Sequence, residues 1–138
     1  KDGTGLAMME KCVAAQGGDP KALSDRSLLP TAPHEKAVAL AEPGQIASFD
    51  TEAVGRAAMV LGAGRARSRD PIDLGVGLQM CARRGDTLSA KDPLAVVTYR
   101  EESQFEAAQA ILRAAVTLGT PSPKELIMER HPESTHER

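Results

Sequence analysis

The stretch from Asp50 to Tyr99 begins with DTEAVGRAAMVLGAGRARSRDPIDLGVGL and ends with GDTLSAKDPLAVVTY. Its first part predicts a helix, because apolar residues recur there at helical spacing. Asp50 or Thr51 would cap this helix at its start, and Gly62 would end it. A loop rich in glycine and arginine then runs to Pro71.

The second part of the stretch predicts two strands. Residues 74–80 read LGVGLQM, in which large apolar residues alternate with Gly and Gln. Glycine at every second position leaves one face bare, so we expect another backbone or helix to approach it closely. Arg84-Gly85-Asp86 predicts a tight turn. Pro93 is expected to start the last strand, Leu94 to Tyr99, where a missing N–H matters least.

The residues before this stretch predict a helix and a hairpin. Thr4 is the expected N-cap of a helix that ends at Gly17-Gly18, and a polar, proline-bounded connection covers residues 19–33. Two short strands are then expected, at Lys36 to Ala41 and at Gln45 to Phe49. Because Glu42-Pro43-Gly44 between them has good turn chemistry, we expect the two strands to pair as a hairpin.

After the stretch, Ser103 and Glu106 fit a capping box, Ser at the N-cap and Glu three residues on. The helix that they start is expected to run to Gly119, with Phe105, Ala108, Ile111, Leu112, Ala115 and Val116 on one side. Residues 126–128 are expected to dock as a short extended segment, and residues 131–138 to fray.

Composition gives a soluble α+β domain and excludes several classes of function. The chain has 138 residues, 41% hydrophobic but only 2% aromatic, so the core must be aliphatic and few rings could stack on bases. A net charge of -2 gives no basic footprint for nucleic acid, and no apolar run approaches the roughly 20 residues of a membrane span. We therefore expect no nucleic-acid or membrane partner. Because the chain begins with Lys1, we also expect it to be a piece of a longer polypeptide.

Cys12 and Cys81 lie far apart and form no metal-binding spacing. They are interpreted as small buried apolar residues in a reducing, cytoplasmic compartment. His34 has no sequence-marked partner and is assigned to surface or capping use, and His131 and His136 are not spaced for a metal. No metal, cofactor or catalytic residue is expected from these patterns.

Arg65, Arg67 and Arg69 are the candidates for substrate binding, because guanidinium forks suit phosphate oxygens. A phosphate-cradling loop should precede a helix, so that the positive end of the helix faces the anion, whereas this loop follows one. Two interpretations stay open. The loop is either a solvated segment that supports the helix C-terminus, or it contacts a substrate or a neighbouring domain.

The strings DTEAVGRAAMVLGAGR, DPIDLGVGL and RRGDTLSAKDPLAVV, in that order and spacing, resemble the C-terminal region of pyrimidine-nucleoside phosphorylases, the thymidine phosphorylase family. AAQGGDP and PHEKAVALAEPGQIASFDT extend the resemblance, which covers about Leu6 to Thr117. It implies an α/β-hammerhead-like domain with flanking helices. Residues 1–28 would belong to the parent α/β domain, residues 29–119 would form the C-terminal domain, and residues 120–138 would be a tail.

The resemblance also implies an activity for the parent enzyme. In this family, phosphate attacks the anomeric carbon of a pyrimidine nucleoside and gives free base and a pentose 1-phosphate. The Lys-His-Ser-type phosphate segment and the Arg, Ser and Lys of the base site do not occur in this sequence, so no catalytic residue is carried over. The implied partners are the N-terminal portion of the parent and, in the parent, a second subunit. Phosphate is the co-substrate, and the fragment alone would be inactive.

In relatives, the loop Gly62 to Asp70 lies in the region facing the cleft, and we expect it to help the closed state form. GDTLSAKDPLAVV is also similar to half of a biotinyl or lipoyl carrier domain. Lys91 lies between Ala90 and Asp92 rather than beside a Met, which disfavours a carrier. The alternative function, from another class, is a free-standing hammerhead module that acts by binding.

Overall fold

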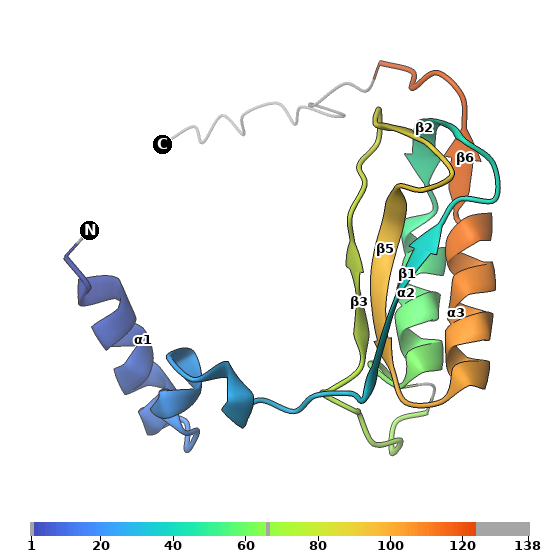
Figure 1. Cartoon of the computed structure of the whole chain (residues 1–138). Helices are drawn as coiled ribbons and strands as arrows, with labels where there is room; N and C mark the ends of the chain where they lie inside the picture. The colour runs from blue at the N-terminus through green and yellow to red at the C-terminus, as the bar shows by residue number, and fades with distance from the viewer. Residues whose placement is uncertain (1, 66, 124–138) are drawn as a thin grey trace, which may run out of the picture.

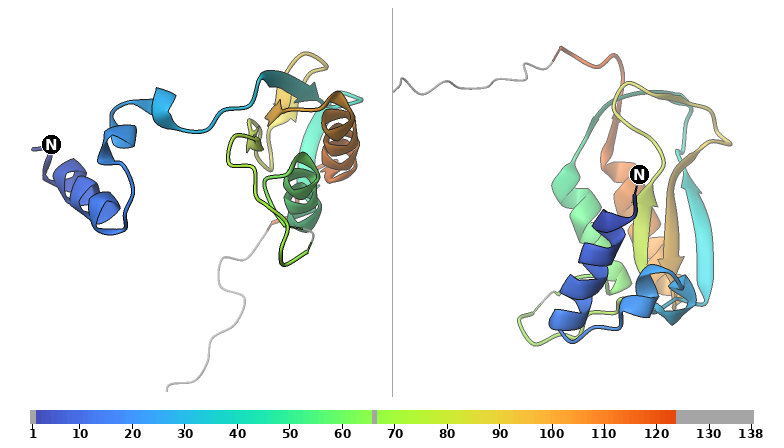
Figure 2. Two further views of the ribbon diagram at one scale, coloured as in Figure 1. Left: turned by 90° about the horizontal axis from the view of Figure 1, so that it is seen from below. Right: turned by 90° about the vertical axis from the view of Figure 1, so that its left-hand side faces the viewer.

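The computed structural model describes residues 2–65 and 67–123 and shows an α/β unit preceded by a helical N-terminal segment (Figure 1). Helix α1 spans Thr4–Ala15 and is followed by two 3₁₀ turns, η1 at Pro20–Leu23 and η2 at Arg26–Leu28. These elements lie apart from the α/β unit in Figure 1 and in the left view of Figure 2. None of the residues of α1 is buried.

The main layer of the α/β unit is an antiparallel sheet with the strand order β1-β5-β3. Its strands are β1 (His34–Ala39), β5 (Pro93–Tyr99) and β3 (Gly77–Met80). Helices α2 (Thr51–Leu61) and α3 (Glu102–Ala114) pack side by side on one face of this sheet (Figure 1). The sheet and the two helices form two layers with the core between them.

A second sheet lies at one end of the unit and has the order β4-β2-β6. Its strands are β4 (Thr87–Leu88), β2 (Gly44–Phe49) and β6 (Val116–Leu118), and both pairings with β2 are antiparallel. The three α-helices and two small antiparallel sheets of the described residues confirm the α+β class. The hammerhead arrangement and the boundaries at residues 28 and 119 stay predictions.

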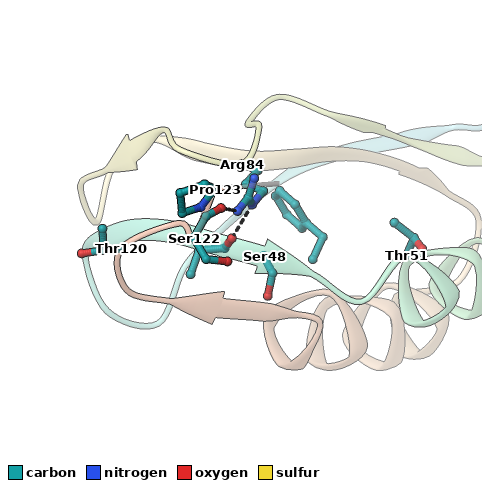
Figure 3. Close-up of a pocket in the computed structure, with 8 residues that line it drawn as sticks. Ser48, Thr51, Arg84, Thr120, Ser122 and Pro123 are labelled. Atoms are coloured by element: carbon teal, nitrogen blue, oxygen red, sulfur yellow. Dashed lines mark hydrogen bonds between the residues drawn. The ribbon is translucent and has the colours of Figure 1, made fainter. Parts of the chain in front are cut away.

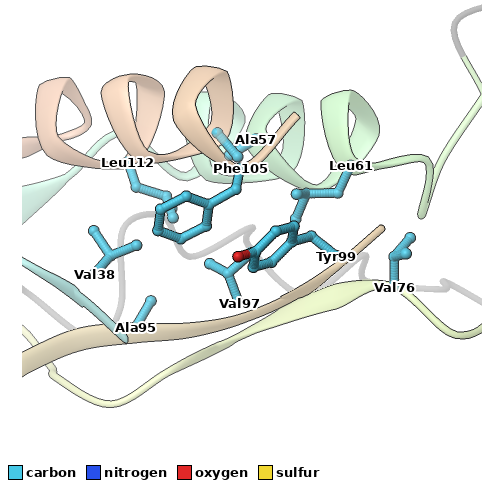
Figure 4. Close-up of a cluster of buried hydrophobic side chains, with 10 residues drawn as sticks. Val38, Ala57, Leu61, Val76, Ala95, Val97, Tyr99, Phe105 and Leu112 are labelled. Carbon is cyan, nitrogen blue, oxygen red and sulfur yellow. The ribbon is translucent and has the colours of Figure 1, made fainter. Parts of the chain in front are cut away.

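Alternate residues of β5 build the core, because side chains of a strand point to opposite faces in turn. Ala95, Val97 and Tyr99 face the helices and are at most 2% exposed. The ring of Tyr99 stacks on that of Phe105, with centroids 4.9 Å apart (Figure 4). These side chains belong to a buried hydrophobic cluster, here called the first cluster. It contains Val38, Ala57, Leu61, Val76, Ala95, Val97, Tyr99, Phe105, Ala108 and Leu112. A second cluster, nearer the second sheet, contains Leu40, Ile46, Ala82, Leu88 and Leu94.

The predicted ends of α2 are confirmed. The Asp50 carboxylate accepts a hydrogen bond from the backbone N of Ala53 at 3.0 Å, and Gly62 has the left-handed φ of 100° that ends the helix. Gly85, at φ 95°, confirms the tight turn at residues 84–86. There the backbone N of Asp86 donates to the carbonyl of Arg83.

The predicted N-caps of the other two helices are wrong. The N-cap of α1 is Gly3, because Thr4 is already helical and its N and Oγ1 donate to Asp2. The N-cap of α3 is Glu101 rather than Ser103. The chain leaves β5 in extended conformation as far as Glu101, whose N donates to Gln104 Oε1 at 3.4 Å, so Ser103 lies inside the helix.

The predicted hairpin between β1 and β2 is also wrong, although both strands exist. β1 pairs with β5, from His34 opposite Tyr99 to Ala39 opposite Pro93, whereas β2 pairs with β4 and β6. The chain passes from the first cluster to the second between Val38 and Leu40, before the predicted turn, and β1 pairs with β5 instead. Val38 lies in the first cluster, and Leu40 and Ile46 lie in the second. Residues 40–43 therefore carry the chain from one sheet to the other.

The helix predicted to reach Gly119 ends at Ala114, because the β-branched residues that follow form β6. Val116 pairs with Phe49, and the N of Gly119 donates to the carbonyl of Gln45 at 2.8 Å. Val116 accordingly belongs to β6 and packs against the second cluster instead of the helix face.

The strand predicted at residues 74–80 is shortened to β3, Gly77–Met80. The N of Gly75 donates to the side chain of Asp73 at 2.9 Å. This local turn occupies the residues before Gly77, so the strand begins later than predicted. The close approach expected at the glycines is confirmed at Gly75, where an added Cβ would lie 2.7 Å from the carbonyl carbon of Thr31. It is wrong at Gly77, where nothing lies within 4 Å.

The expected burial of both cysteines is wrong. Cys12 and Cys81 are free and exposed, since α1 packs on no core and Cys81 follows the end of β3. No helix in the described part of the chain combines the length and the apolar character needed to cross a membrane. The segments predicted at residues 126–128 and 131–138 lie outside the described residues.

The two glycines provide a matched test of the packing around β3. We expect Gly75→Ala to lower the free energy of unfolding by about 1–3 kcal/mol, because the added methyl group meets the Thr31 backbone rather than a flexible side chain. Gly77→Ala is the control and should change it by less than about 0.5 kcal/mol. Urea unfolding followed by the fluorescence of Tyr99, the one tyrosine of a chain without tryptophan, measures both. Equal effects at the two positions would contradict the assignment.

Candidate functional site

Three exposed arginines follow the C-terminus of α2 in the arginine loop, which we define as residues 62–70. The loop begins with a backbone cap of α2. The N of Gly62 donates to the carbonyl of Met59, and the N of Ala63 donates to the carbonyl of Ala58. The N of Arg67 donates to the Asp70 carboxylate at 2.7 Å, which closes a turn. The side chains of Arg65, Arg67 and Arg69 are exposed, and among the described residues none of them forms an ion pair.

The orientation of α2 decides what this loop can do chemically. The loop lies at the carbonyl end of the helix, where the helix dipole repels an anion. No helix N-terminus in the loop is available to cradle a phosphate, in agreement with the order read from the sequence. Any anion at the loop would therefore be bound by the guanidinium groups themselves.

An ion pair that the sequence did not indicate lies where the loop rejoins the sheet. Arg100 Nε is 2.5 Å from Asp73 Oδ2, and Arg100 Nη2 donates to Asp73 Oδ1 at 3.1 Å. The hydrogen bonds from Arg100, and then that from the N of Gly75, lower the pKa of the Asp73 carboxyl below its usual value. Arg100 Nη2 also donates to the carbonyl of Thr31 at 3.3 Å. No periodicity or spacing links residues so distant in sequence.

A second polar cluster lies where β1, β5 and α3 meet. Lys36 Nζ is 2.6 Å from Glu102 Oε1, and the Tyr99 hydroxyl donates to Glu102 Oε2 at 2.9 Å. His34, assigned from the sequence to surface or capping use, is exposed, with its ring centroid 5.3 Å from that of Tyr99. Lys36 also lies over the rings of Tyr99 and Phe105. The amine, the carboxylate and the phenol are paired with one another, so the cluster joins strands to helix.

A hollow of about 510 Å³ lies between β2 and the segment after β6 (Figure 3). Arg84 crosses it, donating from Nε to the carbonyl of Ala47 at 2.8 Å and from Nη2 to the carbonyl of Ser122. Its donors therefore tie two backbone segments together. The hollow is lined by Ala47, Ser48, Phe49, Thr51, Arg84, Thr120, Ser122 and Pro123.

A neighbouring hollow of about 340 Å³ shares three lining residues with the first, Phe49, Thr51 and Arg84. Its other lining residues are Val54, Met80, Ala82 and Arg83. None of the three candidate arginines lines either hollow. In the described residues, no three His, Cys, Asp or Glu side chains gather closely enough to hold a metal ion.

Comparison with known families supports the resemblance read from the sequence. The model of the pyrimidine nucleoside phosphorylase C-terminal domain matches residues 45–119, just over half of the chain. The matched region begins in β2 and runs to the end of β6, and it contains α2, the arginine loop, Asp73, Arg100 and α3.

The Lys36–Glu102 pair predicts a pH dependence of stability. Lys36, and then Tyr99, hold the pKa of Glu102 below its ordinary value of 4.5. A carboxylate with a lowered folded-state pKa stabilises the fold above its unfolded pKa, and this contribution is lost as the pH falls through the folded pKa. We therefore expect Glu102→Gln to destabilise the chain at pH 7 and to have a smaller effect at pH 3.

Urea midpoints at the two pH values, read from Tyr99, make this measurement. Glu106→Gln is the control, since Glu106 is an exposed carboxylate on α3 that belongs to no ion pair of the described residues. An effect of Glu102→Gln that is as large at pH 3 as at pH 7 would contradict the ionic origin of the contribution.

Proposed function

Because this chain belongs to the pyrimidine nucleoside phosphorylase family through its C-terminal domain, we propose that it works as that domain in a phosphorolytic enzyme. The proposed reaction is the reversible attack of inorganic phosphate on the anomeric carbon of a pyrimidine nucleoside. The bond from that carbon to the base nitrogen breaks, and the products are free base and a pentose 1-phosphate. The family match over residues 45–119 carries this proposal.

The proposed role of the chain is structural support and closure rather than bond breaking. Catalysis of this kind depends on holding an anion and a leaving base in register and on stabilising the developing charge. We place the groups that do so in the N-terminal portion of the parent polypeptide, which would be the main partner of this chain. The parent is proposed to act as a homodimer in the cytoplasm, with phosphate as co-substrate and no other cofactor.

The arginine loop is the part of the chain that we assign to the cleft. Its three guanidinium groups are exposed and lie within a few residues of one another, so they can approach a bound anion when the enzyme closes. Loops that close over a substrate exclude water and complete the site, which raises turnover without contributing to the stability of the domain.

The first test of this proposal uses the chain alone. We expect the 138-residue chain, incubated with thymidine or uridine and phosphate, to release no thymine or uracil, as measured by chromatography. The longer polypeptide, assayed in parallel, should release base. Release by the chain alone would contradict our placing of the catalytic groups, whereas inactivity of both proteins would favour a binding module.

The second test addresses the loop in the full-length polypeptide. Replacing Arg65, Arg67 and Arg69 together by Ala should lower kcat/KM for phosphorolysis on the order of 10-fold to 100-fold, because charge stabilisation in the closed state is lost. The melting temperature should hardly change, since the three side chains are exposed.

Two controls accompany the triple-alanine variant. Replacing Lys11, Lys21 and Lys91 by Ala removes the same charge from exposed positions outside the loop and should leave the kinetics unchanged. Replacing the three arginines by Lys keeps the charge but not the planar fork, and should restore activity only in part. Unchanged kinetics of the triple-alanine variant would reject the role of the loop.

A further inference from the structure

Three segments that are distant in the sequence meet at the side chain of Arg100. Arg100 lies between the end of β5 and the start of α3. Its guanidinium contacts the Asp73 carboxylate, which follows the arginine loop, and the carbonyl of Thr31, in the connection that leads from η2 to β1. Among the side-chain hydrogen bonds of the described residues, those of Arg100 join Asp73 to this connection.

The geometry at this point is that of a two-pronged guanidinium–carboxylate fork. Nε and Nη2 of Arg100 donate to the two carboxylate oxygens of Asp73 at 2.5 and 3.1 Å. Such parallel bonds fix orientation as well as distance, which a lysine cannot do. The Asp73 side chain is 28% exposed and that of Arg100 45%, so the fork is partly shielded from water.

Asp73 also forms hydrogen bonds with the first residue of the arginine loop and with Gly75, which follows the loop. Its backbone N donates to the carbonyl of Gly62, the first residue of the arginine loop, at 3.0 Å. Its Oδ1 accepts from the N of Gly75 at 2.9 Å. Gly75 itself leaves the space through which Thr31 approaches, since an added Cβ would lie 2.8 Å from the Thr31 oxygen. The start of the loop, its end and the connection are thus bonded to one another through Asp73 and Arg100.

We propose that Asp73 and Arg100 are positioning residues that lock the arginine loop to the connection at Thr31, and that the loop's part in turnover depends on this lock. The inference rests on the proposed function, because it concerns the same loop. Neither residue need touch a substrate. They act by keeping Gly62 and Gly75, and hence the arginines between them, in one orientation relative to the segment that enters the α/β unit.

The physical half of the proposal is tested by hydrogen exchange on the 138-residue chain. Arg100→Lys keeps the charge and removes the fork, and Asp73→Asn keeps an acceptor for Gly75 but removes the ion pair. In both variants, the amides of residues 73 and 75 should exchange faster, on the order of 10-fold, while those of the β5 core keep their rates. Arg56→Lys is the control, since it alters an exposed pair, 2.6 Å from Glu52, outside the loop.

The functional half is tested by a double-mutant cycle in the full-length polypeptide. Arg100→Lys alone should lower kcat/KM on the order of 10-fold to 100-fold, as expected for a misplaced positioning element. In the background with Arg65, Arg67 and Arg69 replaced by Ala, it should lower kcat/KM no further, because the loop through which it acts no longer contributes.

The outcomes separate this inference from the proposed function. Unchanged exchange at residues 73 and 75 in both variants overturns the lock. An equal loss of activity from Arg100→Lys in the two backgrounds overturns its action through the loop. If the triple-alanine enzyme has unchanged kinetics, the proposed role of the loop is rejected. The proposed effect of the lock on turnover is then rejected as well. A loop that matters, combined with a fully active Arg100→Lys enzyme, rejects the lock alone.

Discussion

The burial of one side of strand β5 is the constraint on which the rest of the α/β unit depends. Ala95, Val97 and Tyr99 contribute to the core that α2 and α3 cover, while Leu94, on the opposite side of the strand, reaches the second cluster. A strand that is needed by two clusters must be central, so β1 and β3 flank it. The chain then has to leave the first sheet to form β2. Thr31 before β1, Asp73 before β3 and Arg100 after β5 meet through the side chain of Arg100.

Features encoded by a few neighbouring residues could be predicted from the sequence. Asp50 and Gly62 mark the ends of α2 because a cap and a left-handed glycine are local requirements. Pro93 marks the start of β5, and Gly85 marks a turn, for similar reasons. The exposure of the three loop arginines, and their place after rather than before a helix, could likewise be read from the residue order.

Features that depend on distant partners could not be predicted in this way. The turn chemistry at residues 42–44 favours a hairpin, but Val38 of β1 belongs to the first cluster, whereas Leu40 and Ile46 on the two sides of the turn belong to the second. The long-range pairing of β1 with β5 prevails. Residues 116–118 continue the apolar pattern of the preceding helix, so the sequence alone favours a longer helix. They form a strand because they pair with β2, which is distant in the sequence. At the candidate site, the sequence identified the arginines but not the Asp73–Arg100 fork, because a guanidinium and a carboxylate 27 residues apart carry no mutual signal.

Helix α1 has a consequence for any measurement of the stability of this chain. It spans 12 residues, buries none of them and exposes Leu6, Met8 and Met9, so its helicity depends on local propensity rather than on tertiary packing. Helices of this length are marginal in water. On heating, the far-ultraviolet circular dichroism of the chain would therefore begin to fall before the emission of the buried Tyr99 changes. The two signals would not superimpose, and a two-state fit to the dichroism alone would misstate the cooperativity of the α/β unit.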